Sequence, residues 1–221
     1  MAQHGRKAQK KLAKKKAKRA EKRSQVSRLT TSSIESLLLS AVEWPILETL
    51  LPVNLWNQGI GNCIIARQLP NGRIAFANIL LDTFCLGVKD AFVEIVSLGE
   101  YQNMRAEVDH VGRLKAVSPE LFAKLVNDAI DYAADLGFQP HPDFAPAELL
   151  LEGIDTSACY EQFAFGKDGK PLYIQGPNDS PGRIAIIANK VQAAGGTVLT
   201  MLNSQFDEFD DADLEELDDE D

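Results

Sequence analysis

The chain has 221 residues, 45% of them hydrophobic, which is enough for one domain with a proper core or for two small ones. The formal net charge of −9 is unevenly distributed: residues 1–28 carry a net charge of +11, residues 29–206 one of −9 and residues 207–221 one of −11. No apolar run approaches the roughly 18 residues of a membrane-spanning helix, and three widely spaced cysteines without a CxxC pair argue against a disulfide framework or a structural zinc site.

The basic N-terminal segment, residues 1–28, has few apolar side chains other than alanine. It lacks the apolar core and cleavage site of a secretory signal, so we expect a cytoplasmic protein without a membrane partner. Repulsion between lysines four apart favours disorder until a polyanion binds. A solubilising role, or pairing with the acidic C-terminus, explains the composition equally well. The candidate contacts to RNA or DNA phosphates are the lysines at helical spacing: Lys7, Lys10, Lys11, Lys14, Lys15, Lys18 and Lys22.

The folded part is predicted to begin with a helix near Ser32. Ser32 and Glu35 have the spacing of a capping box, and Pro45 ends the helix because proline disfavours a helical preceding residue. Residues 46–56 are apolar and are expected to pack under a sheet.

Residues 62–97 combine strand patterning with a tight-turn signal. Two apolar runs, 63–66 and 74–81, flank Pro70, Asn71 and Gly72, which predicts an antiparallel hairpin. A third apolar run follows at 92–96, and Gly87 before it suggests a bend or bulge.

The next segments alternate between loop and helix signals. Residues 98–117 have two glycines and scattered charges and are predicted to be a loop. Ser118 as N-cap, Pro119 at the first helical position and an apolar stripe predict an amphipathic helix that Gly137 closes. A shorter helix capped by Asp143 is predicted to reach Glu152.

The C-terminal part is predicted to hold a second hairpin, with strands at 160–165 and 172–175 joined by a glycine-flanked turn at 166–169. A last helix, capped by Asp179 or Ser180, ends at Gly195 and precedes a strand at 197–202. The fold class is therefore α+β: a single domain, residues 29–203, with a mainly antiparallel sheet of two hairpins covered by two or three helices.

Four neighbouring polar residues are the candidates for catalysis: Asp82, Cys85, Lys89 and Asp90. An Asp beside a Lys is able to act as an acid–base pair, and a cysteine of lowered pKa as a nucleophile. The structural alternative is that Cys85 is a small buried apolar residue and that Lys89 and Asp90 end a strand.

Two histidines, His110 and His141, are the candidate metal ligands, together with Asp143. His141 lies between prolines in a rigid linker, and helix capping is the better role for Asp143. We therefore predict no metal and no other cofactor.

The acidic segment, residues 204–221, carries four apolar side chains among carboxylates: Phe206, Phe209, Leu214 and Leu217. Such segments dock on basic proteins or remain disordered and solubilising. A third reading is that this segment covers the basic N-terminus at low salt.

Several short sequence motifs make the chain resemble an uncharacterised family of bacterial cytosolic proteins. They are ARQ at 66–68, LD at 81–82 with CLGVKDAF at 85–92, LGF at 136–138, PHPDF at 140–144 and FGKDGKP at 165–171. The resemblance spans residues 57–195 and implies a shared fold without implying an activity.

Three functional hypotheses follow. The first is a non-enzymatic binding protein that contacts RNA or ribosomes through residues 7–23. The second is an enzyme of unknown class that uses Asp82, Cys85 and Lys89. The third is a protein–protein adaptor whose acidic segment binds a basic partner.

Overall fold

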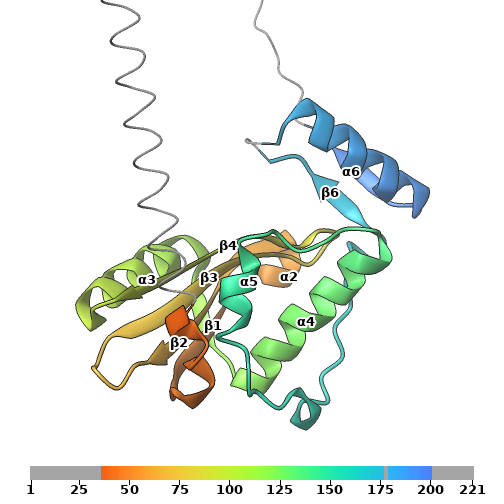
Figure 1. Ribbon diagram of the computed structural model, residues 1–221. Helices are drawn as coiled ribbons and strands as arrows, with labels where there is room; N and C mark the ends of the chain where they lie inside the picture. The colour runs from red at the N-terminus through yellow and green to blue at the C-terminus, as the bar shows by residue number, and fades with distance from the viewer. Residues whose placement is uncertain (1–35, 177–178, 201–221) are drawn as a thin grey trace, which may run out of the picture.

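The computed structural model describes residues 36–176 and 179–200 (Figure 1). The charged segments 1–28 and 204–221, including the seven candidate lysines, lie outside these residues, as does the Ser32–Glu35 capping signal. Residues 36–38 are helical, and the 3-10 turn η1 (Ala41–Glu43) is followed by extended Trp44, directly before Pro45. The end of this first helical region is therefore where the proline predicted it.

A five-stranded antiparallel sheet forms the centre of the domain. Its order is β4-β3-β2-β1-β5, with β1 (Ile46–Pro52), β2 (Ile60–Gln68), β3 (Ile74–Asp82), β4 (Gly87–Val96) and β5 (Leu114–Ala116). The predicted α+β class is confirmed. The sheet contains the predicted hairpin, β2–β3, and a second one, β3–β4, that was not among the two predicted hairpins. Residues 46–52 lie within the sheet as β1 rather than beneath it, and a short helix, α2 (Leu55–Gln58), links β1 to β2.

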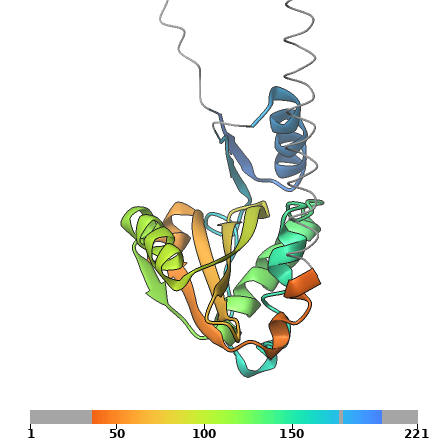
Figure 2. The same cartoon turned by 60° about the vertical axis from the view of Figure 1, so that its left-hand side comes forward.

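Both faces of the sheet are covered, as the strand alternation requires. Odd-numbered β2 and β3 residues such as Ile65 and Ile79 pack against α4 (Pro119–Asp135) and α5 (Phe144–Glu148). Even-numbered residues such as Ile64 and Phe76 pack against α3 (Leu98–Gly112). Figures 1 and 2 show α3 on one side of the sheet and α4 with α5 on the other.

Helix α4 is the element that the sequence predicted best. The Ser118 hydroxyl accepts a hydrogen bond from the N–H of Leu121 (3.2 Å), Pro119 is the first helical residue, and Phe122 and Val126 are fully buried. Gly137 follows the helix with a φ of +80°, a left-handed conformation that glycine adopts without a steric penalty.

The prediction of a loop over residues 98–117 is wrong, because this segment contains α3 and β5. Helix α3 buries Tyr101 and leaves most of its side chains in solvent, so its apolar stripe is too sparse to stand out. The missed signal is its start, where Ser97 and Glu100 form a reciprocal capping box.

The predicted hairpin over residues 160–175 is also wrong. Residues 160–165 form no strand, and β6 (Leu172–Ile174) pairs in parallel with β7 (Thr197–Leu199) across α6 (Pro181–Ala193). Of this prediction, only the turn is present, closed by an antiparallel bridge between Lys167 and Lys170. The short 3-10 helix η2 (Thr156–Ala158) precedes it in the chain. We call β6, α6 and β7 the C-terminal unit; it stands at one end of the sheet (Figure 1).

The C-terminal unit has its own small core, in which Tyr173, Ile187 and Val191 pack together with Phe138. Parallel strands need a crossover connection, and α6 provides it. Within the part of the chain that the structure describes, no helix has the length and apolar character needed to cross a bilayer.

Candidate functional site

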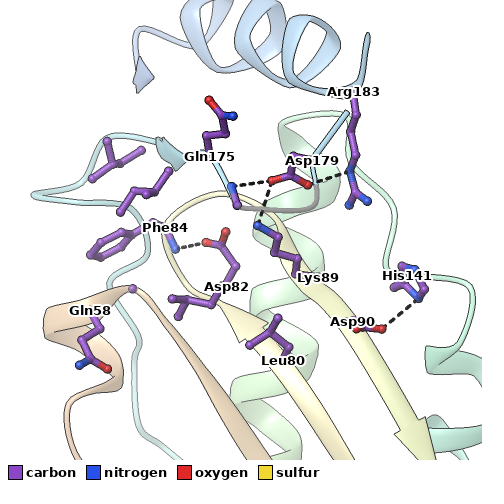
Figure 3. A pocket seen from close by; sticks show the side chains of 15 residues that line it. Gln58, Leu80, Asp82, Phe84, Lys89, Asp90, His141, Gln175, Asp179 and Arg183 are labelled. Carbon is purple, nitrogen blue, oxygen red and sulfur yellow. Dashed lines mark hydrogen bonds and ion pairs between the residues drawn. The ribbon is translucent and has the colours of Figure 1, made fainter. Parts of the chain in front are cut away.

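A cavity of about 460 Å³ lies between the end of the sheet and the C-terminal unit (Figure 3). Its wall is mostly apolar with several polar groups, a composition typical of small-molecule sites, and its volume falls in their range of roughly 300–1,000 Å³. The lining residues that carry the argument below are Leu80, Asp82, Phe84, Lys89, Asp90, His141, Leu172, Ile174, Asp179 and Arg183.

A β-bulge turns Lys89 out of the strand ladder. Leu81 of β3 pairs with Val88 of β4, whereas the preceding Leu80 pairs with Asp90, so Lys89 is the extra residue. Val88 and Ala91 consequently face the same core although they are three positions apart. The irregularity predicted at Gly87 is thus real, but its extra residue is Lys89.

Gly87 is needed for close packing at the start of β4. Its φ is +64°, and a Cβ there would lie 2.8 Å from the carbonyl oxygen of Ala129 in α4. No other residue fits without displacing the helix backbone, so Gly87 fixes how closely β4 approaches α4.

Asp82 ends β3 and holds the turn into β4. Its Oδ1 accepts hydrogen bonds from the N–H groups of Phe84 and Cys85, both at 2.9 Å, and the residue is only 6% exposed. Burial raises the pKa of this carboxyl and outweighs the hydrogen bonds and the charge of Lys89, which act in the opposite direction. Asp82 is therefore a carboxyl of raised pKa on the cavity wall.

Asp179 fastens the C-terminal unit to the sheet. Its Oδ2 accepts hydrogen bonds from the N–H of Gly176 (2.8 Å) and the hydroxyl of Tyr173 (2.9 Å), and it lies 3.3 Å from the Lys89 ammonium. Burial alone would raise the pKa of Asp179, but these hydrogen bonds and the charge of Lys89 outweigh it and lower the pKa. We call the contact between Lys89 and Asp179 the clamp (Figure 3).

Cys85 does not provide the nucleophile that the sequence suggested. Its side chain is completely buried and packs with Leu86, Tyr173 and Ile187. Burial, followed by the charge of Asp82, raises the pKa of the thiol, so the thiolate is disfavoured. The structural alternative for Cys85 therefore holds.

The other three candidates, Asp82, Lys89 and Asp90, do line the same cavity, and His141 joins them. His141 Nδ1 lies 3.6 Å from Asp90 Oδ1 and 3.8 Å from Asp143 Oδ2. The candidate metal ligand His110 lies elsewhere, exposed on α3.

The capping role predicted for Asp143 is wrong. α5 begins directly after Asp143, but no side-chain cap forms, because the carboxylate faces His141 instead. The helix also ends at Glu148 rather than at Glu152.

Sequence reasoning missed the partners that the C-terminal unit supplies. Asp179 was a candidate helix cap, yet Ser180 caps α6 through a hydrogen bond from the N–H of Arg183 (3.3 Å). Lys89 and Asp179 are 90 positions apart, so no local pattern links them. The available signal was a lysine in a mostly apolar stretch, beside the irregularity predicted at Gly87, because an ammonium in such a place needs a carboxylate partner.

The stability of the domain should respond to pH through Asp82. Because the pKa of this carboxyl is raised in the folded state, its contribution is present below the unfolded pKa of about 3.9 and is lost as pH rises through the folded value. Asp82→Asn keeps an Oδ1 acceptor for Phe84 and Cys85 and removes the charge. We expect the variant to gain stability over the wild type as pH rises, in urea unfolding between pH 4 and 8. A difference that is constant across this range would contradict the assignment.

Comparison of the chain with protein-family models finds no match, and neither curated proteins nor solved structures yield one.

Proposed function

We propose that this protein is a non-enzymatic binding protein whose folded domain takes up a small organic molecule in the cavity. The observation that carries this proposal is the convergence of Asp82 and the clamp on a mostly apolar cavity of about 460 Å³. Charged groups are kept at such a wall at a cost in desolvation, and perturbed carboxyls in clefts are typical of binding sites.

The wall suggests the chemistry of the bound molecule. Phe84, Leu172 and Ile174 offer apolar contacts, while Asp82 offers an acceptor and Lys89 a donor on the same wall (Figure 3). The Lys89 ammonium contacts the Asp179 carboxylate at 3.3 Å, and it serves this wall as a hydrogen-bond donor. A partly apolar molecule with both donor and acceptor groups fits this wall, and the enzymatic alternative loses its nucleophile with Cys85.

The test is a fragment screen on the full-length chain by ligand-observed NMR, repeated on a variant with a filled cavity. Ile174 on β6 lines the cavity and is 44% exposed, so Ile174→Trp should fill space without disturbing the core. Its register partner Leu199 on β7 is similarly exposed but does not line the cavity.

Fragments that bind the wild type should be lost from Ile174→Trp and retained by the matched control Leu199→Trp. A screen without hits, or hits that bind both variants equally, would remove the proposal.

A second function, contact with RNA or ribosomes in the cytoplasm, is favoured by the charge of the N-terminal segment. Residues 1–28 contain 12 Lys and Arg and one Glu, whereas the rest of the chain is acidic. Lysines that neutralise phosphates release counterions, so binding through them is steeply salt-dependent.

Deletion of residues 1–27 should abolish RNA binding in a filter or fluorescence assay. Replacing the seven candidate lysines by glutamine should flatten the slope of log K against log salt by about 5 units for single-stranded RNA, whereas arginine in the same positions should preserve it. RNA binding that survives the deletion would argue against this second function.

A further inference from the structure

Three side chains with metal-binding atoms converge beside the cavity. Asp90 comes from β4, directly after the bulged Lys89, while His141 and Asp143 come from the turn that precedes α5. One carboxylate oxygen of each Asp and an imidazole nitrogen of His141 lie within 4.8 Å of one another. The residues belong to segments about 50 positions apart in the sequence, so the fold itself creates the cluster.

Within residues 36–176 and 179–200, no lysine or arginine forms an ion pair with the carboxylates of this cluster. Lys89 and Arg183 both reach Asp179, whereas the only ion-pair partner of Asp90 and Asp143 in the described residues is His141. Two carboxylates and a neutral imidazole amount to a formal charge of −2, which a divalent cation would balance.

Backbone contacts hold the cluster in place. The N–H of His141 donates to the carbonyl of Val88 (3.0 Å), which ties the turn to the bulged strand. The N–H of Asp143 donates to His141 Nδ1 (3.3 Å), and the N–H of Ala91 donates to Asp90 Oδ1 (2.9 Å). A metal at Nδ1 would replace the first of these two side-chain hydrogen bonds.

The spacing suits a transition metal after a small adjustment. Bonds of about 2.1 Å to zinc at the tetrahedral angle place the ligand atoms roughly 3.4 Å apart. His141 Nδ1 lies 3.6 Å from the Asp90 oxygen and 3.8 Å from the Asp143 oxygen, a little more than this distance. The side chains of Asp90 and Asp143 are 62% and 70% exposed, so a small inward movement meets no packed neighbour, although that of Asp90 works against its hydrogen bond from Ala91.

We propose that Asp90, His141 and Asp143 bind a divalent transition-metal ion of the zinc type at the wall of the cavity. One imidazole and two carboxylates form a ligand set that such ions accept. Three protein ligands leave a further position for water or for an oxygen of a bound molecule. Asp90 and His141 line the cavity, which places this ion where it contributes to that wall (Figure 3). Such a site does not require that the cavity bind an organic molecule.

The test uses the metal alone. Full-length protein, freed of metal by a chelator, is titrated with Zn²⁺ against a chromophoric competitor, and imidazole ¹⁵N spectra report which histidine nitrogen binds. Wild-type protein should bind one equivalent, with a shift of His141 Nδ1. His141→Ala should weaken binding by at least about 100-fold, since even the loss of an outer-shell partner costs roughly 10–100-fold. Asp90→Asn and Asp143→Asn should each weaken binding by at least about 10-fold.

The matched controls are His110→Ala and Asp135→Asn, both at exposed helical positions outside the cluster. They should bind Zn²⁺ as the wild type does. Affinity that is unchanged in all three cluster variants, or lost equally in the controls, overturns the proposal. Dependence on His141 without dependence on either Asp also overturns it, because the ion would then have different ligands.

Discussion

Arg67→Met is expected to destabilise the domain by about 3–5 kcal/mol, because each buried carbonyl left without its donor costs roughly 1–3 kcal/mol. The Arg67 guanidinium is 3% exposed and donates to the carbonyl oxygens of Trp44 (2.8 Å), Leu150 (2.8 Å) and Glu152 (2.7 Å). Methionine fills the space but leaves three carbonyls without a donor. These carbonyls belong to the segments before β1 and after α5, so one side chain joins both to the sheet.

Urea unfolding followed by far-UV circular dichroism measures this loss. Arg73→Met is the matched control, because Arg73 is an exposed residue of the β2–β3 turn and donates to the single carbonyl of Ile95. Its cost should stay below about 1 kcal/mol, as for most surface substitutions. An Arg67 variant as stable as the control would show that the three carbonyls find water or other donors.

Asp179→Ala is expected to release the C-terminal unit at a cost of about 3 kcal/mol. This is the lower end of the range for a broken buried pair, since the cavity lets water reach the Lys89 side chain, which is 14% exposed. The substitution also leaves the Tyr173 hydroxyl and the Gly176 N–H without their acceptor. Amide hydrogen exchange should speed up in residues 172–199 while protection of β2 and β3 is retained.

Arg183→Ala provides the comparison, because Arg183 lies 3.8 Å from the other oxygen of Asp179 and is 49% exposed. Pairs of this kind contribute about 0–1 kcal/mol, so exchange in the C-terminal unit should barely change. Uniform loss of protection over the whole domain in Asp179→Ala would mean that the unit and the sheet unfold together.

Elements with strong local signals were predictable from the sequence. The β2–β3 hairpin follows from Asn71 and Gly72 between two apolar runs, and α4 follows from Ser118, Pro119 and a dense apolar stripe. In both cases propensity, turn chemistry and burial agree. Helix α3 escaped prediction because its face against the sheet is narrow, although the Ser97 capping box marks where it begins.

Pairings between distant segments were not predictable. The sequence around residues 172–174 does not indicate whether this strand pairs with the preceding segment or with residues 197–199. The glycine-rich turn at 166–169 favoured the local pairing, but α6 has an apolar face that must be buried, and the parallel pair gives it a surface to cover.

In the candidate site, too, the residues close in sequence were predictable and those brought in from distant segments were not. Asp82, Lys89 and Asp90, which the sequence grouped by proximity, line one cavity, and His141, a candidate metal ligand, lines it too. Sequence proximity also grouped Cys85 with them, because spacing alone does not show which way a side chain points in the turn between β3 and β4. Asp179 acquires its role only through tertiary contact with Lys89.

The bulge at Lys89 also affects what this edge of the sheet presents to other molecules. β4 is an outer strand, and a long regular outer strand is a template on which a foreign chain can add itself. Here the ladder is interrupted at Lys89, the Val88 carbonyl is occupied by the N–H of His141, and Asp90 and Glu94 place exposed charges along the same strand. The residues that shape the cavity therefore also oppose edge-to-edge aggregation of this domain.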